Sequence, residues 1–433
     1  MSTVIDRSQA DFHRLAGFLP GHQTPWIADL RARALARFAE QGYPTPREEA
    51  WKYTDLAPLA GKHFQPLATR DEVVARVAID DYVLDPQWPR LVFIDGYHVP
   101  ALSMLPAGVS LAPLAEVLAQ SPDTIKPLFT ASDEARGFAA LNTAFMSDGL
   151  CLRLTPNVVL EQPIHFIHIA HGGARPAASY LRHLVLAGRG SRATLIEHYV
   201  GEGADAKAGA LTSTMTQCVL EEGAALEHYQ LNEQGLSVYH FSSVHVHQSR
   251  GSRYVSHNVQ AGARIARSDL HAVLAEPGAQ CVMNGLYFGR GRQIVDNCTF
   301  IDHQAPHCSS RQIYRGVLDG ESRGVFNGHV MVRQDAQHTD AQQMNSNLLL
   351  SDDAEADARP QLTINADDVK CSHGATVGQL NEDALFYLRA RGVAAERARA
   401  MLVQAFAADI VSHMSAERVR MHLDALIAAR LGR

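Results

Sequence analysis

A cysteine and a histidine lie two residues apart near the C-terminal end, in the stretch DDVKCSHGATVG at 367–378. On an extended strand Cys371 and His373 would share one face, with Cα atoms roughly 7 Å apart, because successive side chains point to opposite faces. A thiolate and a neutral imidazole both bind iron or zinc. Lys370 would favour the ionised thiol if the two side chains approach each other. The pair is therefore a candidate metal or cluster site.

A structural interpretation of the same pair stays open. A free cysteine is commonly a small buried residue, and two ligands alone do not make a metal site. Under this interpretation Cys371 packs in a core, and His373 is a hydrogen-bonded residue at the end of a strand.

Several of the 22 histidines cluster with other ligand-type side chains. His245 and His247 would share a strand face and could chelate a metal, although histidine pairs on a solvated sheet face are commonly plain surface residues. The other candidate groups are His165, His168 and His171; Asp302, His303, His307 and Cys308; and the carboxylates Glu161, Glu197 and Glu227. Carboxylate sets serve glycosidases, but the spacing here fits a solvated face equally well.

Signature motifs of several enzyme classes are absent from the sequence. It contains no G-x-x-x-x-G-K-[ST] nucleotide loop, no G-x-S-x-G elbow and no H-E-x-x-H helix. The sequence therefore argues against a self-contained nucleotidase or hydrolase of those kinds.

The composition is ordinary for a globular protein with ample core, at 433 residues, 46% hydrophobic and 20% charged. A formal charge of −7 offers no general attraction to nucleic acid or to an anionic membrane. There is no run of 18 apolar residues, and the first residues lack the apolar core of a signal peptide, so we expect a cytoplasmic protein. Six scattered cysteines are expected to be reduced.

The pattern of apolar residues, glycines and prolines divides the chain into three regions, which would position the candidate ligand residues. Residues 1–147 are predicted to be mostly helical with short strands, and one helix is predicted to begin at Thr24 and Pro25. The apolar stripe of that helix is Ile27, Leu30, Ala34 and Phe38. Residues 148–369 alternate strand-like runs with turns that hold glycines such as Gly190 and Gly223, and residues 370–433 are predicted to be helical.

The periodicity of 148–369 fits either a β-sandwich or a stack of strand-turn coils. The region is long for one sandwich, which favours the coils. A polar alternation that suits stacked amide rungs also favours them; its members are Thr339, Gln342, Gln343, Asn345 and Asn347.

The C-terminal region is predicted to hold three amphipathic helices. Asn381 is the expected N-cap of the first and Gly392 its stop, while the third follows Ser415. The second begins near Ala395, and its predicted apolar stripe is Ala398, Met401, Leu402, Ala405 and Phe406. Such helices either cap the last coil, whose edge needs cover, or dock a partner.

The order of short motifs between 324 and 393 resembles the SufB/SufD family of iron–sulfur cluster assembly scaffolds. These motifs are GVFNG (324–328), AQHTDA (336–341), NSNLLLS (345–351), PQL (360–362), DVKCSHGATVG (368–378) and LFYLRARG (385–392). A looser match, PREEAWKYT at 46–54, extends the resemblance over most of the chain. Within the family, the DVKCSHGAT stretch favours the SufD branch over the SufB branch.

The resemblance implies a mainly β fold, a right-handed parallel β-helix flanked by N-terminal and C-terminal helical regions. It further implies a non-catalytic scaffold subunit that pairs with a SufB paralogue through the β-helix and binds the ABC-type ATPase SufC through the C-terminal helices, with ATPase activity in that partner. No cofactor is expected to be bound permanently; a transient iron–sulfur cluster would lie at the interface with SufB. His373 is the expected cluster ligand, with Cys371 second.

The predicted partner-binding residues are Leu385, Leu388, Met401, Leu402 and Phe406. The chain alone is predicted to form a homodimer, because a solenoid surface made for a paralogue is exposed. Two other interpretations stay open. One is a β-helix carbohydrate-active enzyme, and the other is a purely structural assembly subunit without a cluster ligand.

Overall fold

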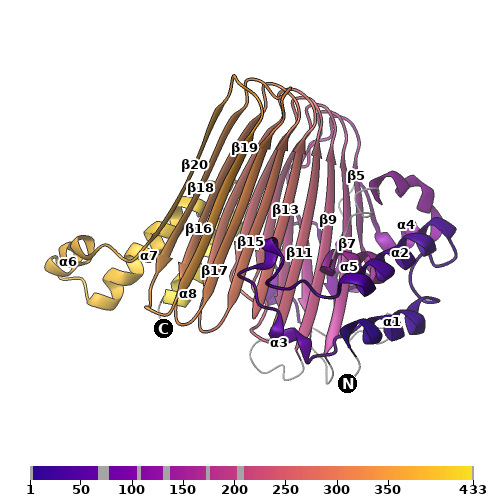
Figure 1. Ribbon diagram of the computed structural model, residues 1–433, viewed down its shortest axis with the longest axis horizontal. Helices are drawn as coiled ribbons and strands as arrows, with labels where there is room; N and C mark the ends of the chain where they lie inside the picture. The colour runs from indigo at the N-terminus through magenta and orange to yellow at the C-terminus, as the bar shows by residue number, and fades with distance from the viewer. Residues whose placement is uncertain are drawn as a thin grey trace.

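The turn-punctuated middle of the chain folds into a parallel β-solenoid. In the computed structural model, which describes residues 3–66, 78–104, 109–129, 137–171, 176–201 and 209–431, successive strands alternate between two sheets (Figure 1). Each coil therefore gives one strand to each sheet and spans roughly 30 residues, which is typical of a solenoid repeat. The mainly β architecture predicted from the sequence, with helices at both ends, is confirmed.

The two sheets have ten strands each among the described residues. Sheet A consists of β19 (Glu355–Ile364), β17 (Arg323–Val332), β15 (Ile294–His303), β13 (Ile265–Leu274), β11 (Val238–Gln248), β9 (Ala210–Leu220), β7 (Ala177–Ala187), β5 (Asp148–Leu154) and β4 (Ser110–Pro113), with β1 (Gln65–Pro66) beside β7. Sheet B consists of β20 (Lys370–Gly378), β18 (Asp340–Leu349), β16 (Ser309–Leu318), β14 (Gln280–Gly289), β12 (Arg253–Gln260), β10 (Ala225–Asn232), β8 (Arg192–Gly201), β6 (Ile164–Ala170), β2 (Arg90–Ile94) and β3 (Tyr97–His98).

Stacked glycine turns connect the coils on one side. Gly190 and Gly223 adopt left-handed φ angles of 65° and 68°, which glycine reaches without steric cost. The Gly190 N–H donates to the carbonyl of Glu222 at 2.9 Å, one coil further along. Each turn is thus fastened to the next, as a stack of coils requires.

The interior of the solenoid is apolar at many positions and amide-rich at others. Its apolar cluster includes Leu226, Tyr254 and Phe326. Of the predicted amide alternation, Gln343, Asn345 and Asn347 are buried, whereas Gln342 is exposed on the outer face of β18. The Gln343 amide donates to the Gln312 carbonyl of the preceding coil at 2.5 Å, so an amide rung between coils is present.

The N-terminal helices cover the outer face of the first half of sheet A (Figure 1). They are α1 (Val4–Leu15), α2 (Pro25–Gln41), α3 (Ala57–Ala60), α4 (Leu114–Gln120) and α5 (Gly137–Phe145). The predicted stripe of α2 is buried at all four positions. Phe138 of α5 stacks on Phe241 of β11 with ring centroids 3.5 Å apart, which joins helix and sheet in one core.

The C-terminal helices α7 (Ala395–Val411) and α8 (Glu417–Leu431) pack on the outer face of sheet B. The first helix of this region, α6 (Glu382–Ala390), packs against α7 and projects away from the solenoid (Figure 1). As predicted, Asn381 caps α6, and its side chain accepts a hydrogen bond from the Ala384 N–H at 2.8 Å. No helix among the residues described here is long and apolar enough to cross a membrane.

Two predictions about this region need correction. The helical region was expected to begin at residue 370, but 370–378 forms β20, because the alternating side chains pair in register with β18. The predicted stripe of α7 was wrong in part: Ala398 is buried as expected, but Met401 is 43% exposed, and the other buried positions are Val403, Ala407, Ile410 and Val411. Apolar residues occur on more than one face of this alanine-rich helix, so spacing alone fits two stripes.

Candidate functional site at the open end of the solenoid

The last coil of the solenoid is open on one side. Strands β19 and β20 end the two sheet orders, so within the described residues neither has a strand beyond it. Residues of β20 are mostly exposed, whereas the equivalent positions of earlier coils are buried. An uncovered sheet edge presents unpaired backbone groups and side chains that a further strand or partner would normally cover.

Cys371 and His373 lie on this last strand and face the same side, as predicted. Cys371 pairs in register with Ala341 of β18, and His373 pairs with Gln343. The thiol is half-buried and packs against the interior apolar cluster. Burial raises the pKa of Cys371, and the charge of Asp340 adds to this effect. Lys370 is the neighbouring residue on β20 and points to the opposite face, so the approach that activation of the thiol by this lysine would require is not met.

His373 differs from Cys371 in being exposed. Within the described part of the chain, no residue forms a hydrogen bond or ion pair with its imidazole. Behind it, Gln343 is buried and hydrogen-bonded to Gln312. Strand pairing therefore fixes the backbone of His373, while both nitrogens of its imidazole lack a hydrogen-bond partner among the described residues.

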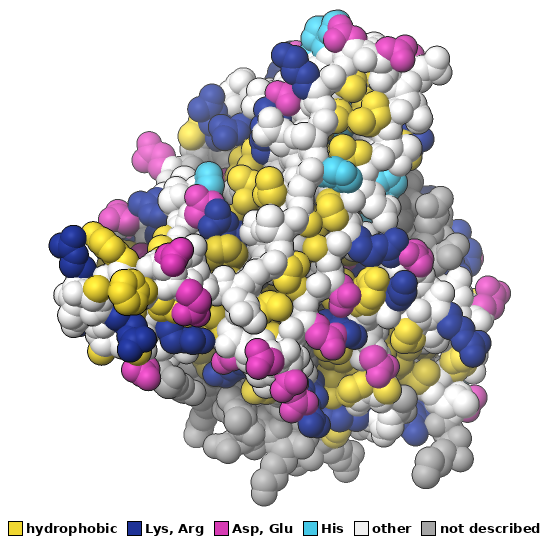
Figure 2. Space-filling model, turned by 60° about the vertical axis from the view of Figure 1, so that its left-hand side comes forward, with side chains coloured by type: hydrophobic (Ala, Val, Ile, Leu, Met, Phe, Trp, Pro, Cys, Tyr) yellow, Lys and Arg dark blue, Asp and Glu magenta, His cyan; other side chains and the backbone are white. Residues whose placement is uncertain are grey.

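Apolar side chains surround this edge. Met344, Ile364 and Val377 of the last coils are 45%, 42% and 51% exposed. Figure 2 brings this end of the molecule forward and shows hydrophobic side chains gathered along the strands between charged ones. Exposed apolar side chains on a sheet edge are typical of a protein–protein interface.

The predicted partner-binding residues fall into two groups. Met401 is exposed and Leu388 and Leu402 are half-buried, but Leu385 is 8% exposed and belongs to the packing of α6. Phe406 packs towards the solenoid, where the Arg315 guanidinium lies 4.8 Å from its ring centroid. The most exposed apolar side chains of α6 are Phe386 and Tyr387, at 74% and 59%. Docking on these helices would therefore use Phe386, Tyr387 and Met401.

Among the residues that the structure describes, the histidine groups singled out in the sequence do not converge into metal sites. His165 and His168 are three residues apart on β6, so their side chains lie on opposite faces and are separately buried. His245 is half-buried beside His271, with ring centroids 5.2 Å apart, while His247 is exposed. Burial lowers the pKa of His245 to about 4, so this imidazole is neutral near pH 7.

The mixed group at 302–308 is also dispersed. Asp302 accepts two hydrogen bonds from the Arg333 guanidinium, and His303 is buried and bonds the Ser310 hydroxyl at 2.9 Å. His307 stacks on His338 in the neighbouring turn, and Cys308 is a buried free thiol. All six cysteines have free side chains.

The three carboxylates do not share a groove. Glu161 is exposed, whereas Glu227 lies on the outer face of sheet B, where it accepts a hydrogen bond from the Ser415 hydroxyl at 2.5 Å. Glu197 is fully buried inside the solenoid, which corrects the expectation of a solvated face. It accepts hydrogen bonds from Tyr199 at 2.5 Å and Thr216 at 2.6 Å.

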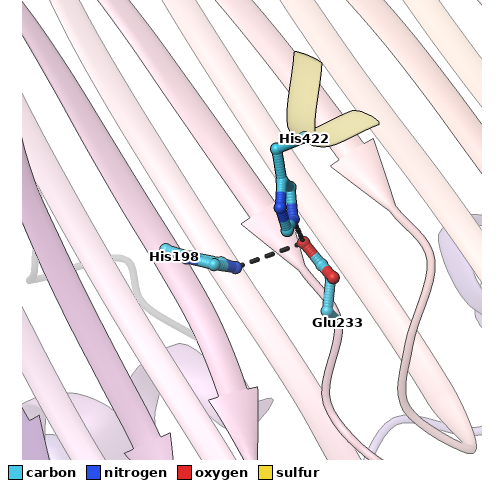
Figure 3. A group of neighbouring side chains, drawn as sticks. All are labelled: His198, Glu233 and His422. Carbon is cyan, nitrogen blue, oxygen red and sulfur yellow. Dashed lines mark hydrogen bonds and ion pairs between the residues drawn. The ribbon is translucent and has the colours of Figure 1, made fainter. Parts of the chain in front are cut away.

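One group of ligand-type residues escaped the sequence analysis. His198, Glu233 and His422 converge from three elements, although they are far apart in the chain (Figure 3). No local motif marks them, because α8 reaches sheet B only through the fold.

Comparison with known proteins agrees with the motif resemblance. Residues 168–406 match the family described as SUF system FeS cluster assembly, SufBD core domain, and residues 9–166 match the SufBD protein N-terminal region. The iron–sulfur cluster assembly protein SufD of Escherichia coli is 32% identical, over 92% of this chain and 91% of that protein. The SufBD family protein slr0076 of Synechocystis sp. is 30% identical, over 99% of this chain and 96% of that protein. The SufD protein of Bacillus subtilis is 23% identical, over 99% of this chain and all of that protein. The chain therefore belongs to the SufBD family of iron–sulfur cluster assembly proteins and is a homologue of SufD.

Proposed function

We propose that this chain is a SufD-type, non-catalytic scaffold subunit of a cytoplasmic SufBCD complex. In this proposal the open end of the solenoid pairs with a SufB paralogue, and the C-terminal helices dock the SufC ATPase. A nascent iron–sulfur cluster is the cargo, held transiently between the two paralogues. ATP hydrolysis takes place in SufC, and this chain contributes the binding surfaces for its partners and one ligand for the cluster.

The observation that carries the proposal is the state of His373. Its imidazole is exposed, lacks a partner among the described residues and lies on the last strand of the solenoid. A ligand for a cluster shared between two chains must lie at their junction, and neutral imidazole binds iron. Cys371 is the weaker ligand, because its half-buried thiol has a raised pKa and iron binds the thiolate.

The edge itself supports pairing with a paralogue. A second solenoid with the same coil geometry would cover the exposed apolar side chains of Met344, Ile364 and Val377. It would also satisfy the free edges of β19 and β20. The chain alone would cover the same surface by forming a homodimer.

The helix α6 supports docking of a further protein. It projects from the body of the molecule and exposes Phe386 and Tyr387 (Figure 1). Large aromatic side chains dominate the binding energy of many interfaces. A cap for the last coil would instead lie on β20, so the position of α6 favours the docking role.

The scattering of the carboxylates favours a scaffold over a carbohydrate-active enzyme. A glycosidase needs two carboxyl groups facing one bound sugar, about 5–10 Å apart. Glu197 lies in the interior and Glu227 on the outer face of sheet B, on opposite sides of one sheet.

The test is anaerobic cluster reconstitution on the chain co-expressed with its SufB and SufC partners, followed by iron quantitation and absorption spectroscopy. His373→Ala is expected to lose most of the cluster while the complex still elutes intact from gel filtration. Cys371→Ser is expected to retain most of it. His247→Ala, an exposed histidine on a distant strand, is the matched control.

Two outcomes would overturn parts of the proposal. If His373→Ala keeps full cluster content in an intact complex, the chain is a structural half of the scaffold without a ligand. If no complex forms with either partner, the docking surfaces are misassigned.

A further inference from the structure

A partly buried carboxylate joins two imidazoles under the last helix. His198 belongs to β8, Glu233 follows β10 directly, and His422 belongs to α8. Figure 3 shows both imidazoles directed at one oxygen of Glu233. His198 Nε2 lies 3.2 Å from Glu233 Oε1, and His422 Nε2 lies 2.5 Å from it. The three ligand atoms all lie within 4.8 Å of one another.

We propose that His198, Glu233 and His422 form a binding site for a divalent first-row transition ion of the Zn²⁺ or Fe²⁺ class. Two imidazoles and one carboxylate are a donor set that such ions prefer, and three protein ligands leave a position for water. The ion would fasten α8 to sheet B. The site lies on β8 and β10, far from β20 in the strand order, and is independent of the proposed cluster ligand.

The separations fit the proposal with small adjustments. Ligand atoms bound at 2.0–2.1 Å in a tetrahedral arrangement lie roughly 3.4 Å apart. The His198–Glu233 separation of 3.2 Å is already close to that value. The shorter His422–Glu233 separation would have to increase by about 1 Å. The side chain of His422 is partly exposed on α8, so a change of its side-chain torsion angles can supply this movement.

The imidazole of His165 contacts the other ring nitrogen of His198, the one that faces away from Glu233. His165 Nε2 lies 3.3 Å from His198 Nδ1, and both residues are fully buried. When Nδ1–H of His198 donates to His165, the lone pair of Nε2 faces Glu233 and is free to bind a cation. Metal-binding histidines usually carry such a hydrogen bond on the other ring nitrogen.

The exposure of the three side chains leaves a way in for a cation. The side chain of His198 is 1% exposed, Glu233 is 17% exposed and His422 is 27% exposed, so an ion could enter past His422.

The same geometry allows a simpler arrangement, in which two imidazole N–H groups donate to one carboxylate and no metal binds. The two arrangements differ in metal affinity. Glutamine in place of His422 keeps an N–H donor for Glu233, so helix docking survives, but a neutral amide is a poor ligand for Zn²⁺. His422→Gln therefore separates metal binding from folding.

The first experiment is a Zn²⁺ titration by calorimetry on the full chain after removal of metal with a chelator. Wild type is expected to bind one equivalent tightly. His422→Gln and Glu233→Gln are expected to lower the Zn²⁺ affinity of that site by more than about 100-fold. Loss of a residue that only hydrogen-bonds to a metal ligand typically lowers the affinity by roughly 10–100-fold. His413→Gln, an exposed histidine in the turn between α7 and α8, is the matched control and should bind like wild type. Equal affinity in wild type, His422→Gln and Glu233→Gln would overturn the proposal.

A second measurement identifies the ligands directly. X-ray absorption at the zinc edge of the loaded chain is expected to show two imidazoles and further oxygen ligands at about 2.0–2.1 Å. Sulfur in the first coordination sphere would place the ion at a cysteine and contradict the site. Thermal unfolding of each variant, without added metal, checks that lost binding does not reflect lost folding.

Discussion

Gln343 and His373 are register partners on β18 and β20, and the imidazole is the exposed last member of a row of inward-facing side chains. Gln343 donates to Gln312 at 2.5 Å, and Gln312 in turn donates to Thr299 of sheet A at 2.5 Å. The strand that carries the proposed cluster ligand therefore pairs with a strand whose buried amide side chain begins a hydrogen-bonded chain across the solenoid. No further coil among the described residues covers His373.

Gly328→Ala is expected to disturb this amide chain. A Cβ at Gly328 would lie 2.2 Å from Gln343 Nε2 and 2.7 Å from the Phe326 ring, so the substitution overpacks the interior. The free energy of unfolding should fall by about 1–3 kcal/mol, measured by urea denaturation. Gly378→Ala has no atom within 4 Å of the added Cβ and should change stability by less than about 0.5 kcal/mol. Equal effects of the two substitutions would show that Gln343 moves aside without cost.

His183→Phe is expected to make the protein less sensitive to acid. Burial lowers the pKa of His183 to about 4, and the nearby charge of Glu197 only partly opposes this. Neither ring nitrogen has a hydrogen-bond partner among the described residues, and Phe93 and Phe166 flank the ring, so phenylalanine suits the site.

The sign follows from the two pKa values of His183. In the unfolded chain the imidazole takes up a proton near pH 6.5, whereas the folded protein excludes it until about pH 4. Stability is therefore lost as the pH falls through this window, by on the order of 3 kcal/mol at pH 4. Urea denaturation at several pH values should show a smaller loss for His183→Phe than for wild type. The assignment of this acid sensitivity to His183 would be contradicted if the stability of wild type and His183→Phe fell in parallel with pH. It would also be contradicted if the exposed control His247→Phe reduced the loss equally.

Phe386→Ala is expected to weaken binding of the ATPase partner without destabilising the fold. Phe386 is 74% exposed on α6, so its truncation should leave the free energy of unfolding within about 0.5 kcal/mol of wild type. Loss of an aromatic anchor should raise the Kd for SufC at least about 10-fold. The neighbouring Leu385 is 8% exposed, and Leu385→Ala should instead cost about 2 kcal/mol of stability or more. Unchanged SufC affinity in Phe386→Ala would remove α6 from the interface.

Val377→Lys is expected to prevent self-association through the open end of the solenoid. Val377 is 51% exposed on the edge strand β20, and a lysine at a sheet edge opposes strand-to-strand pairing. Analytical ultracentrifugation should show a dimer for wild type and a monomer for the variant. Val159→Lys changes an equally exposed valine away from this edge and should remain a dimer. A monomeric wild type would contradict the homodimer prediction.

Much of the fold could be predicted from residues close in sequence. The left-handed glycines at Gly190 and Gly223 mark turns in any context, and Asn381 caps a helix through atoms three residues away. The position of Cys371 and His373 on one strand face likewise follows from a spacing of two. Periodicity alone did not decide between a solenoid and a sandwich. The resemblance of the motifs to the SufB/SufD family favoured the solenoid.

The rest depended on contacts between distant segments. The chain places Glu197 inside and Glu227 outside the same sheet, and both have strand-like neighbours, so burial could not be assigned from the local pattern. The group of His198, Glu233 and His422 exists only because α8 folds back onto β8 and β10. The apolar face of α7 was misassigned for a related reason, since its contact with sheet B buries Val403 and Ala407 and leaves Met401 exposed.

The most direct test of His373 as a cluster ligand is a pulsed EPR measurement of the reduced cluster in the assembled complex, with this chain alone labelled with ¹⁵N-histidine. A ¹⁵N hyperfine coupling from a bound imidazole is expected in wild type, and it should disappear in His373→Ala and remain unchanged in His247→Ala. A reduced cluster in the wild-type complex without any ¹⁵N coupling would contradict the claim that His373 holds it.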